Sequence, residues 1–236
     1  MTTDNPAVRK RSKWWKVLRV LAIGLPFAIG VFAATHVAWK RAGSGQWVEK
    51  IDKDGIKVWS RKRPGETITD IKAVMRIRNT PTTAIAAFMN EGCDDFMEGC
   101  VSWMDFEPWS EKTLQSTGIG VVIYPFKLKP REFLLRTRVS QDPKTKAVLM
   151  HVTSHPDLLP RNKFCHRVED VDNRWLFTPL GNGQTEVEFT MHMDEGMPYF
   201  LVNPMTPRVV HKLMADLPSH FDKPQYQNVK LAYIQQ

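Results

Sequence analysis

The sequence has little cysteine and none of the compact motifs that hold zinc. Its 236 residues include three cysteines, Cys93, Cys100 and Cys165, an odd number without a paired Cys-x-x-Cys spacing. This pattern excludes a zinc ribbon and a disulfide framework as the basis of the fold. We expect the cysteines to be small, buried apolar side chains, with a Cys93–Cys100 bridge outside the cytoplasm as the alternative.

Catalytic and metal-binding patterns are missing as well. The sequence has no Gly-x-Ser-x-Gly elbow and no phosphate-binding glycine loop. His151 and His155 lie four residues apart, but on a strand this spacing spans about 13 Å, too far for one shared ion. We therefore predict no catalytic residue, no metal site and no cofactor.

Excess positive charge is absent from most of the chain, although the net charge is +8. Residues 1–45 contain eight basic side chains and one acidic side chain. The rest of the chain contains 25 basic and 24 acidic side chains, so it is nearly neutral. A nucleic-acid-binding domain should carry its basic charge on its folded part. The distribution therefore excludes nucleic acid as a partner.

Residues 20–39 carry no formal charge. Twenty helical residues span about 30 Å, the thickness of a bilayer core. Six basic residues precede this segment, and Trp14, Trp15 and Trp39 flank it, as interfacial aromatic residues do. We predict a transmembrane anchor with residues 1–19 as a basic cytoplasmic tail, residues 40–45 as a linker, and a domain on the opposite side of the membrane. The alternative is a cleaved signal peptide and a secreted or periplasmic domain.

Alternation of apolar and polar residues predicts many strands after the linker. A short helix should begin after Thr80-Pro81, and a long amphipathic helix should begin at Thr206-Pro207 and end or bend at Pro218. The predicted strands cover residues 47–51, 56–61, 71–77, 101–106, 113–124, 132–140, 147–154, 163–169, 174–179 and 185–194.

This order predicts an α+β fold: a curved antiparallel sheet of about nine strands wrapped around one long C-terminal helix. A sheet of this size curls, and one helix covers only part of its concave face. The uncovered part is a concave apolar site, the usual place for a small apolar ligand.

Four segments resemble motifs of the START lipid-binding family, whose domains have the helix-grip fold. They are Trp47 with Asp54-Gly55-Ile56-Lys57-Val58-Trp59, Tyr124-Pro125-Phe126 with Pro130-Arg131-Glu132-Phe133, His155-Pro156 through Pro179-Leu180, and Asp194-Glu195-Gly196-Met197-Pro198 through Asn203. The resemblance spans residues 46–220 and leaves residues 221–236 as a tail. It departs from the family pattern at Glu132 and Glu195.

The resemblance implies the binding of a lipid or another apolar small molecule, without a cofactor. It also implies that residues 124–130 and about 198–217 gate the cavity. Sterol-binding members have an arginine where this sequence has Thr137, which removes support for a sterol. The protein partner that would deliver or receive the lipid is not indicated.

The predicted lipid-binding residues come from the inward faces of the strands, from the gate and from the last helix. They are Trp103, Tyr124, Phe126, Arg131, Phe133, Leu135, Arg167, Trp175, Phe189, Met191, Met193, Phe200, Asn203, Val210, Leu213 and Met214. For Arg131 and Arg167 we favour structural pairing with Glu132 or Glu169 over contact with a lipid phosphate.

The function predicted from these features is the binding of an apolar lipid, for transfer or sensing at a membrane. The alternative is an enzyme of the same fold, a cyclase or hydrolase acting on a small apolar substrate. Glu132, Glu188 and His192 are then the nearest acid or base candidates, although alternation points Glu188 and His192 outward.

Overall fold

The structure is a computed structural model that describes residues 6–124 and 128–235. For residues 6–13, 16, 19 and 21 it describes the backbone alone. Its helices are α1 Pro6–Arg41, α2 Pro81–Asn90, α3 Cys93–Phe96, α4 Tyr199–Phe221 and the 3-10 turn η1 Pro224–Tyr226. Its strands are β1 Trp47–Lys53, β2 Ile56–Arg61, β3 Asp70–Ile77, β4 Cys100–Ser110, β5 Gln115–Val122, β6 Arg131–Gln141, β7 Val148–Ser154, β8 His166–Val168, β9 Asp170–Gly181 and β10 Gln184–Asp194.

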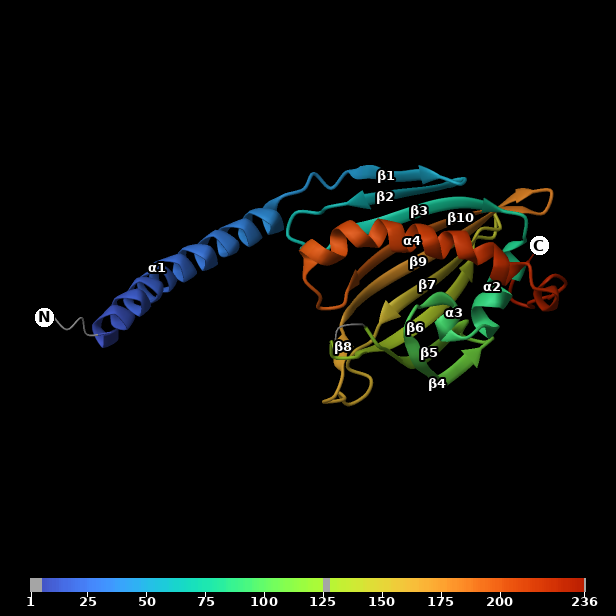
Figure 1. The fold of residues 1–236 in the computed structure, drawn as a ribbon. Coiled ribbons are helices and arrows are strands. Elements are labelled where there is room, and N and C mark those ends of the chain that lie inside the picture. The colour runs from blue at the N-terminus through green and yellow to red at the C-terminus, as the bar shows by residue number, and fades with distance from the viewer. Residues whose placement is uncertain (1–5, 125–127, 236) are drawn as a thin grey trace, which may run out of the picture.

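The strands form one curved sheet in the order β1-β2-β3-β10-β9-β7-β6-β5-β4, with all neighbours antiparallel (Figure 1). The short strand β8 pairs with β6 in parallel. The predicted α+β helix-grip architecture is confirmed. Tight turns join the hairpins: Asp54 and Gly55 both have positive φ (56° and 74°), which matches the twist of the β1–β2 pair.

Helix α4 lies across the concave face and packs mainly on β2 and β3 (Figure 1). Val210, Met214, Leu217 and Phe221 are buried against the sheet. The prediction that this helix begins at Thr206-Pro207 is wrong, because it begins at Tyr199 and contains Pro204, Pro207 and Pro218. Each proline removes one backbone hydrogen-bond donor from the helix. The helix nevertheless continues past these prolines, because Val210 and buried residues after it hold it against the sheet.

The chain after residue 220 also belongs to the packed domain. Phe221, Tyr226 and Ile234 are buried in the same cluster as the inner residues of the sheet. The domain therefore continues past the predicted boundary at residue 220.

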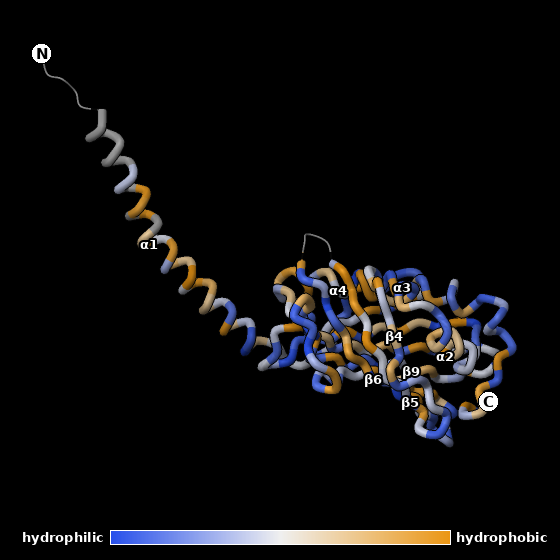
Figure 2. The backbone as a smooth tube through the Cα atoms, turned by 90° about the horizontal axis from the view of Figure 1, so that it is seen from below, coloured by the Kyte–Doolittle hydropathy of each residue, from blue (hydrophilic) through white to orange (hydrophobic). Residues whose placement is uncertain are grey.

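Helix α1 extends away from the folded domain (Figures 1 and 2). Its segment Ala22–Arg41 has a mean hydropathy of 1.6 over the most apolar stretch and is not buried by the rest of the chain. By length and composition this helix is able to cross a membrane.

A disulfide links Cys93 to Cys100, with their Cα atoms 5.9 Å apart. The expectation of unpaired, buried cysteines is therefore wrong for this pair. The sequence did not reveal the short helix α3, whose Asp95 carboxylate accepts a hydrogen bond from the backbone N–H of Gly92 (2.9 Å) and turns the chain back toward β4. Cys165 has no partner of this kind.

We expect the double substitution Cys93→Ala/Cys100→Ala to lower the free energy of unfolding by about 2 kcal/mol, because the bridge restricts the unfolded chain over a short loop. Urea unfolding of the detergent-solubilised protein, followed by circular dichroism, measures this difference. Cys165→Ala is the matched control and should leave the midpoint nearly unchanged. Equal unfolding of the double variant and the parent would contradict a structural role for the bridge.

Candidate functional site

A row of inward-facing side chains crosses the middle of the concave face. Strand register places Thr137 of β6 beside Val152 of β7, Val152 beside Asn173 of β9, and Asn173 beside Met191 of β10. All four side chains are only partly buried. We call Thr137, Val152, Asn173 and Met191 the central row.

The rows on either side of the central row contain more buried side chains, although Met193 in one of them is only partly buried. On one side Val139, Met150, Trp175 and Phe189 are buried, and Trp175 stacks on Phe189 with ring centroids 3.9 Å apart. On the other side Leu135 and Val171 are buried in a second apolar cluster with Phe133, Val122 and Cys100. The inner face is therefore packed at both ends, and the central row between them keeps accessible surface.

Asn173 brings a buried polar atom without a partner into the central row. Its Oδ1 atom is buried, and none of the described residues donates a hydrogen bond to it. An unpaired buried acceptor of this kind costs stability on the order of 1–3 kcal/mol. Sequence reasoning missed Asn173, although it interrupts the apolar alternation Val171-x-Asn173-x-Trp175-x-Phe177, and that interruption was a usable signal.

Trp103 lies at the open edge of the same face. It pairs with Gly120, and Asp105 pairs with Gly118, so all four share the inner side of β4 and β5. A Cβ atom at either glycine would lie 2.5 Å from an atom of the Trp103 ring. The glycines thus let the indole lie flat on the sheet, where its Nε1 donates to Asp105 (2.8 Å) and 38% of the residue stays exposed.

Two loops meet at the end of the sheet where β6 and α4 begin. The Nε of Arg131 donates to the Glu195 carbonyl (3.0 Å), its Nη1 donates to the Lys129 carbonyl (2.6 Å), and its guanidinium lies 5.5 Å from the Tyr124 ring centre. Burial raises the pKa of Glu195, and burial together with Glu195 raises the pKa of Tyr124. These contacts join residues 124–130, one of the two predicted gate segments, to the turn at Glu195 that precedes the other.

Arg167 and Glu132 form a buried ion pair on the outer side of β6 and β8. The Nε and Nη2 atoms of Arg167 each lie 2.7 Å from Oε1 of Glu132, and both side chains are almost fully buried. Glu169 pairs instead with Arg161 (2.5 Å). The structural pairing that we favoured for Arg167 is therefore present, whereas Arg131 binds backbone carbonyls.

The predicted lipid-binding residues other than Trp103 and Arg131, which are described above, fall into three groups. Most lie in the two apolar clusters on the inner face: Tyr124, Phe133, Leu135, Trp175, Phe189, Met191, Met193, Val210, Leu213 and Met214. Others lie elsewhere, because Phe200 is exposed on α4, Arg167 is on the outer side, and Asn203 bonds to the backbone of Thr67 and Thr69. Phe126 lies outside the described residues.

Comparison with known proteins supports the fold through structure alone. No protein-family model and no curated protein sequence matches the chain. A STAR-related lipid transfer protein from Xanthomonas axonopodis superposes with a TM-score of 0.68 at 17% identity, covering 75% of this chain and 99% of that one. Human STARD10 gives a TM-score of 0.65 at 16% identity, and the superposition covers 78% of this chain and 76% of that chain. Human StAR-related lipid transfer protein 5 gives 0.63 at 16% identity, covering 86% and 98%.

The fold is that of a START domain. The resemblance drawn from scattered motifs is thereby confirmed for the fold of the chain.

The outer face of this START fold carries a network of charges around Asp70. Its carboxylate accepts from Arg61, Arg63 and His192 Nδ1 (2.7 Å for the last), and His192 Nε2 lies 3.0 Å from Asp170 Oδ2. Burial acts to raise the pKa of Asp70, but these hydrogen bonds hold it well below its usual range. The bond to Asp70 raises the pKa of His192 to about 9. His192 is thus a structural cation and points away from the concave face.

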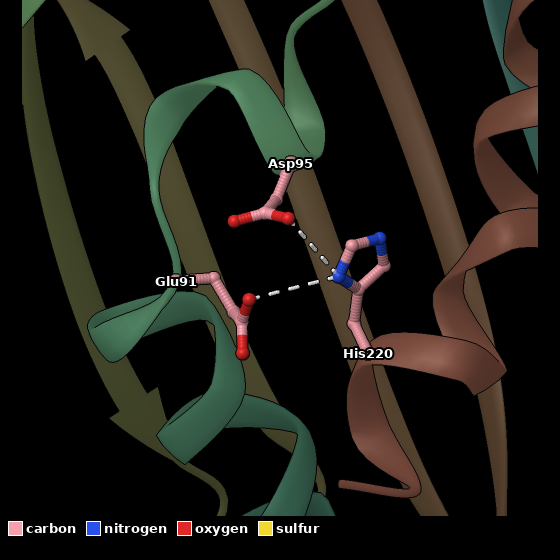
Figure 3. Close-up of side chains that lie close together, drawn as sticks. All are labelled: Glu91, Asp95 and His220. Carbon is pink, nitrogen blue, oxygen red and sulfur yellow. Dashed lines mark ion pairs between the residues drawn. The ribbon is translucent and has the colours of Figure 1, made fainter.

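Glu91, Asp95 and His220 form a second cluster, where α2, α3 and the end of α4 meet (Figure 3). His220 Nδ1 lies 3.8 Å from Glu91 and 3.7 Å from Asp95. Glu91 also accepts from the Lys223 ammonium and from the Tyr226 hydroxyl (2.8 Å), and these bonds lower its pKa although burial opposes them. Because Lys223 already supplies a positive charge to Glu91, we interpret the cluster as a tie between the helix ends.

We expect the stability of the protein to fall as the pH rises from about 6.5 to about 9. The folded-state pKa of His192, about 9, exceeds the unfolded value near 6.5, so its stabilising charge is complete below that range and is lost above it. Thermal unfolding measured between pH 6 and 9.5 tests this.

His192→Gln should flatten the decline, and Asp170→Asn should reduce it in part because one of the two acceptors remains. A decline of the same size in His192→Gln would assign the pH dependence to another group.

Proposed function

We propose that this START-fold domain encloses an apolar lipid across the central row, as a carrier or sensor held at a membrane. The observation that supports the proposal is the central row, whose four side chains are partly exposed between buried Trp175 and Phe189 on one side and buried Leu135 and Val171 on the other. Apolar surface left uncovered within a packed face is a normal place for an apolar ligand. Met191 and Met193 add side chains that adapt to irregular ligand shapes.

The proposed ligand has an apolar body and at least one hydrogen-bond donor. The unpaired Oδ1 of Asn173 requires a donor, and the Thr137 hydroxyl lies two strands away in the same row. The buried charges are paired away from the row, Arg167 with Glu132 and Asp70 with Arg63. A ligand with a hydroxyl or amide group deep in the domain suits this interior better than one with a buried phosphate.

The proposed location is a membrane crossed by α1, with the basic N-terminal residues in the cytoplasm and the domain on the opposite side. The charge distribution supports this orientation. The Cys93–Cys100 bridge supports it independently, since disulfides persist in oxidising compartments. The alternative is a secreted or periplasmic domain that is released by signal cleavage. In both cases the domain lies on the side of the membrane opposite the cytoplasm.

We propose a binding protein rather than an enzyme. Glu132 is neutralised by Arg167, and His192 is held on the outer face. Glu195, whose pKa is raised by burial, lies beside Tyr124 at the end of the site and is the residue that a catalytic alternative would use. A cyclase or hydrolase would change its ligand, whereas a carrier or sensor returns it intact.

Mass spectrometry of the purified full-length protein should detect a co-purifying lipid in about equimolar amount, and an added ligand of the same class should be recovered with unchanged mass. Denatured protein is the background control. Protein that is empty and takes up no fluorescent fatty acid, phospholipid or sterol would contradict the proposal. A product of altered mass that is lost in Glu195→Gln would indicate the enzyme instead.

We expect Asn173→Leu to lower affinity for the bound lipid by roughly tenfold and, at the same time, to leave the protein equally stable or more stable. The ligand loses one buried hydrogen bond, while the empty protein loses an unpaired acceptor. Ligand titration and thermal unfolding of the delipidated protein measure the two effects.

Asn79→Leu is the matched control, because the Asn79 amide already donates to Asp222 (3.1 Å) far from the row. It should reduce stability and leave affinity unchanged. A loss of both stability and affinity in Asn173→Leu would contradict a ligand-binding role for Asn173.

A further inference from the structure

The loop between β7 and β8, residues 155–165, exposes two large apolar side chains. Phe164 is 70% exposed and Leu158 is 44% exposed. Arg161 and Lys163 stand beside them in sequence and are also exposed. The loop therefore combines apolar and basic groups at the surface, the composition of a contact with an anionic lipid surface.

The shape of this loop is fixed from inside by Arg167. Its guanidinium donates to the carbonyls of Pro156, Leu159 (3.3 Å) and Pro160 (3.0 Å) while it pairs with Glu132. Because the loop is built around a buried arginine, it presents Leu158 and Phe164 outward in a defined form.

A cavity of about 260 Å³ opens beside the loop. Its wall contains Lys129, Lys163, Arg161 and Arg167, with Glu169 as the acid. Arg167 is occupied by Glu132, and Arg161 by Glu169. Among the described residues no carboxylate pairs with Lys129 or Lys163, so the cavity has two ammonium groups to offer an anion.

The loop lies at the end of the domain where the anchor helix arrives. The antiparallel order brings the end of β7 and the starts of β1, β6 and α4 to one end of the sheet, and α1 leaves the domain there (Figure 1). Exposed Ile123, Leu128, Phe200, Leu201 and Met205 lie at this end too.

The last turn of α1 is docked rather than free. The Trp39 ring stacks on Tyr199 (centroids 5.7 Å apart), and its Nε1 donates to the Thr67 carbonyl (2.9 Å). The Gly65 N–H donates to the Lys40 carbonyl (2.8 Å). A bilayer crossed by α1 would therefore begin next to this end of the domain.

We propose that loop 155–165 docks on the bilayer that α1 crosses: Leu158 and Phe164 enter its interface, and Lys129 and Lys163 contact the phosphates of anionic lipids. The proposal rests on the proposed membrane anchor. It adds a specific contact surface and a preference for anionic phospholipid.

An environment-sensitive fluorophore at Leu158→Cys tests the docking in the full-length protein with Cys165→Ser. The protein is placed in nanodiscs of phosphatidylcholine, with or without about one third phosphatidylglycerol, and some discs contain spin-labelled lipid. We expect blue-shifted emission and strong quenching by the spin label, both larger in the anionic discs. The matched control is Lys144→Cys in the β6–β7 turn at the opposite end of the sheet, which should report water in every disc.

Lys129→Gln/Lys163→Gln should reduce the quenching in anionic discs to the level in neutral discs, since each lysine near an anionic surface favours docking by about fivefold. A label at residue 158 that behaves like the label at 144 would overturn the proposal. So would an equal response of residue 158 to inorganic phosphate in detergent without lipid. Loss of the protein from the membrane on carbonate extraction would contradict the anchor itself, which separates the two failures.

Discussion

The rest of the structure depends on how one helix covers the concave face of a ten-stranded sheet. Every inward side chain from β3 to β6 must be buried against something, and α4 packs mainly on β2 and β3. Val210, Met214 and Leu217 close that side, whereas the far side is closed by the cluster around Phe133 and the Cys93–Cys100 segment. Val152 and Met191 of the central row pack against these clusters, yet none of the four side chains in the row is fully buried, because a sheet this wide cannot close the row by itself. The candidate site thus exists because the sheet is wider than the area that α4 covers.

The two faces of the sheet also differ in the charged side chains that they carry. The inner face has few: of the buried ions Asp70, Arg131, Glu132 and Arg167, only Arg131 shares the face of Phe133, and it lies at the end of the sheet. Arg167 and Glu132 are enclosed by loop 155–165, and Asp70 is enclosed by Arg61, Arg63 and His192. A buried charge is tolerated only with a partner and hydrogen bonds. With these networks on the outer side and Arg131 at the end of the sheet, the middle of the concave face carries no buried charge, which suits a ligand that brings no net charge.

Alternation in the sequence predicted most of the strands and which of their side chains face inward, because one face is buried and the period of a strand is two. The strand predicted over residues 163–169 is limited to His166–Val168. Alternation also placed Phe133, Phe189 and Met191 correctly on the inner face. It did not give the start of α4, because a proline such as Pro207 is typical of the first turn of a helix. In the structure the helix begins earlier, at Tyr199, and continues past both Pro204 and Pro207. Alternation did not single out Asn173, because an unpaired atom is recognised only when the register with Val152 and Met191 is known. The Cys93–Cys100 bridge likewise required the turn at α3.

The short connection between α1 and the domain limits what the proposed lipid carrier can do. Helix α1 runs to Arg41 and β1 begins at Trp47, so only five residues separate them. Five fully extended residues span less than about 20 Å. In the structure this linker is not extended, because the Gly45 N–H donates to the Lys62 carbonyl and the Lys62 ammonium donates to the Ala42 carbonyl. A domain held this closely cannot carry lipid across a wide aqueous space. In the proposed function it would exchange lipid with the bilayer that α1 is proposed to cross, or with a protein or membrane that approaches the domain. The tether therefore favours local extraction, presentation or sensing over long-range transport.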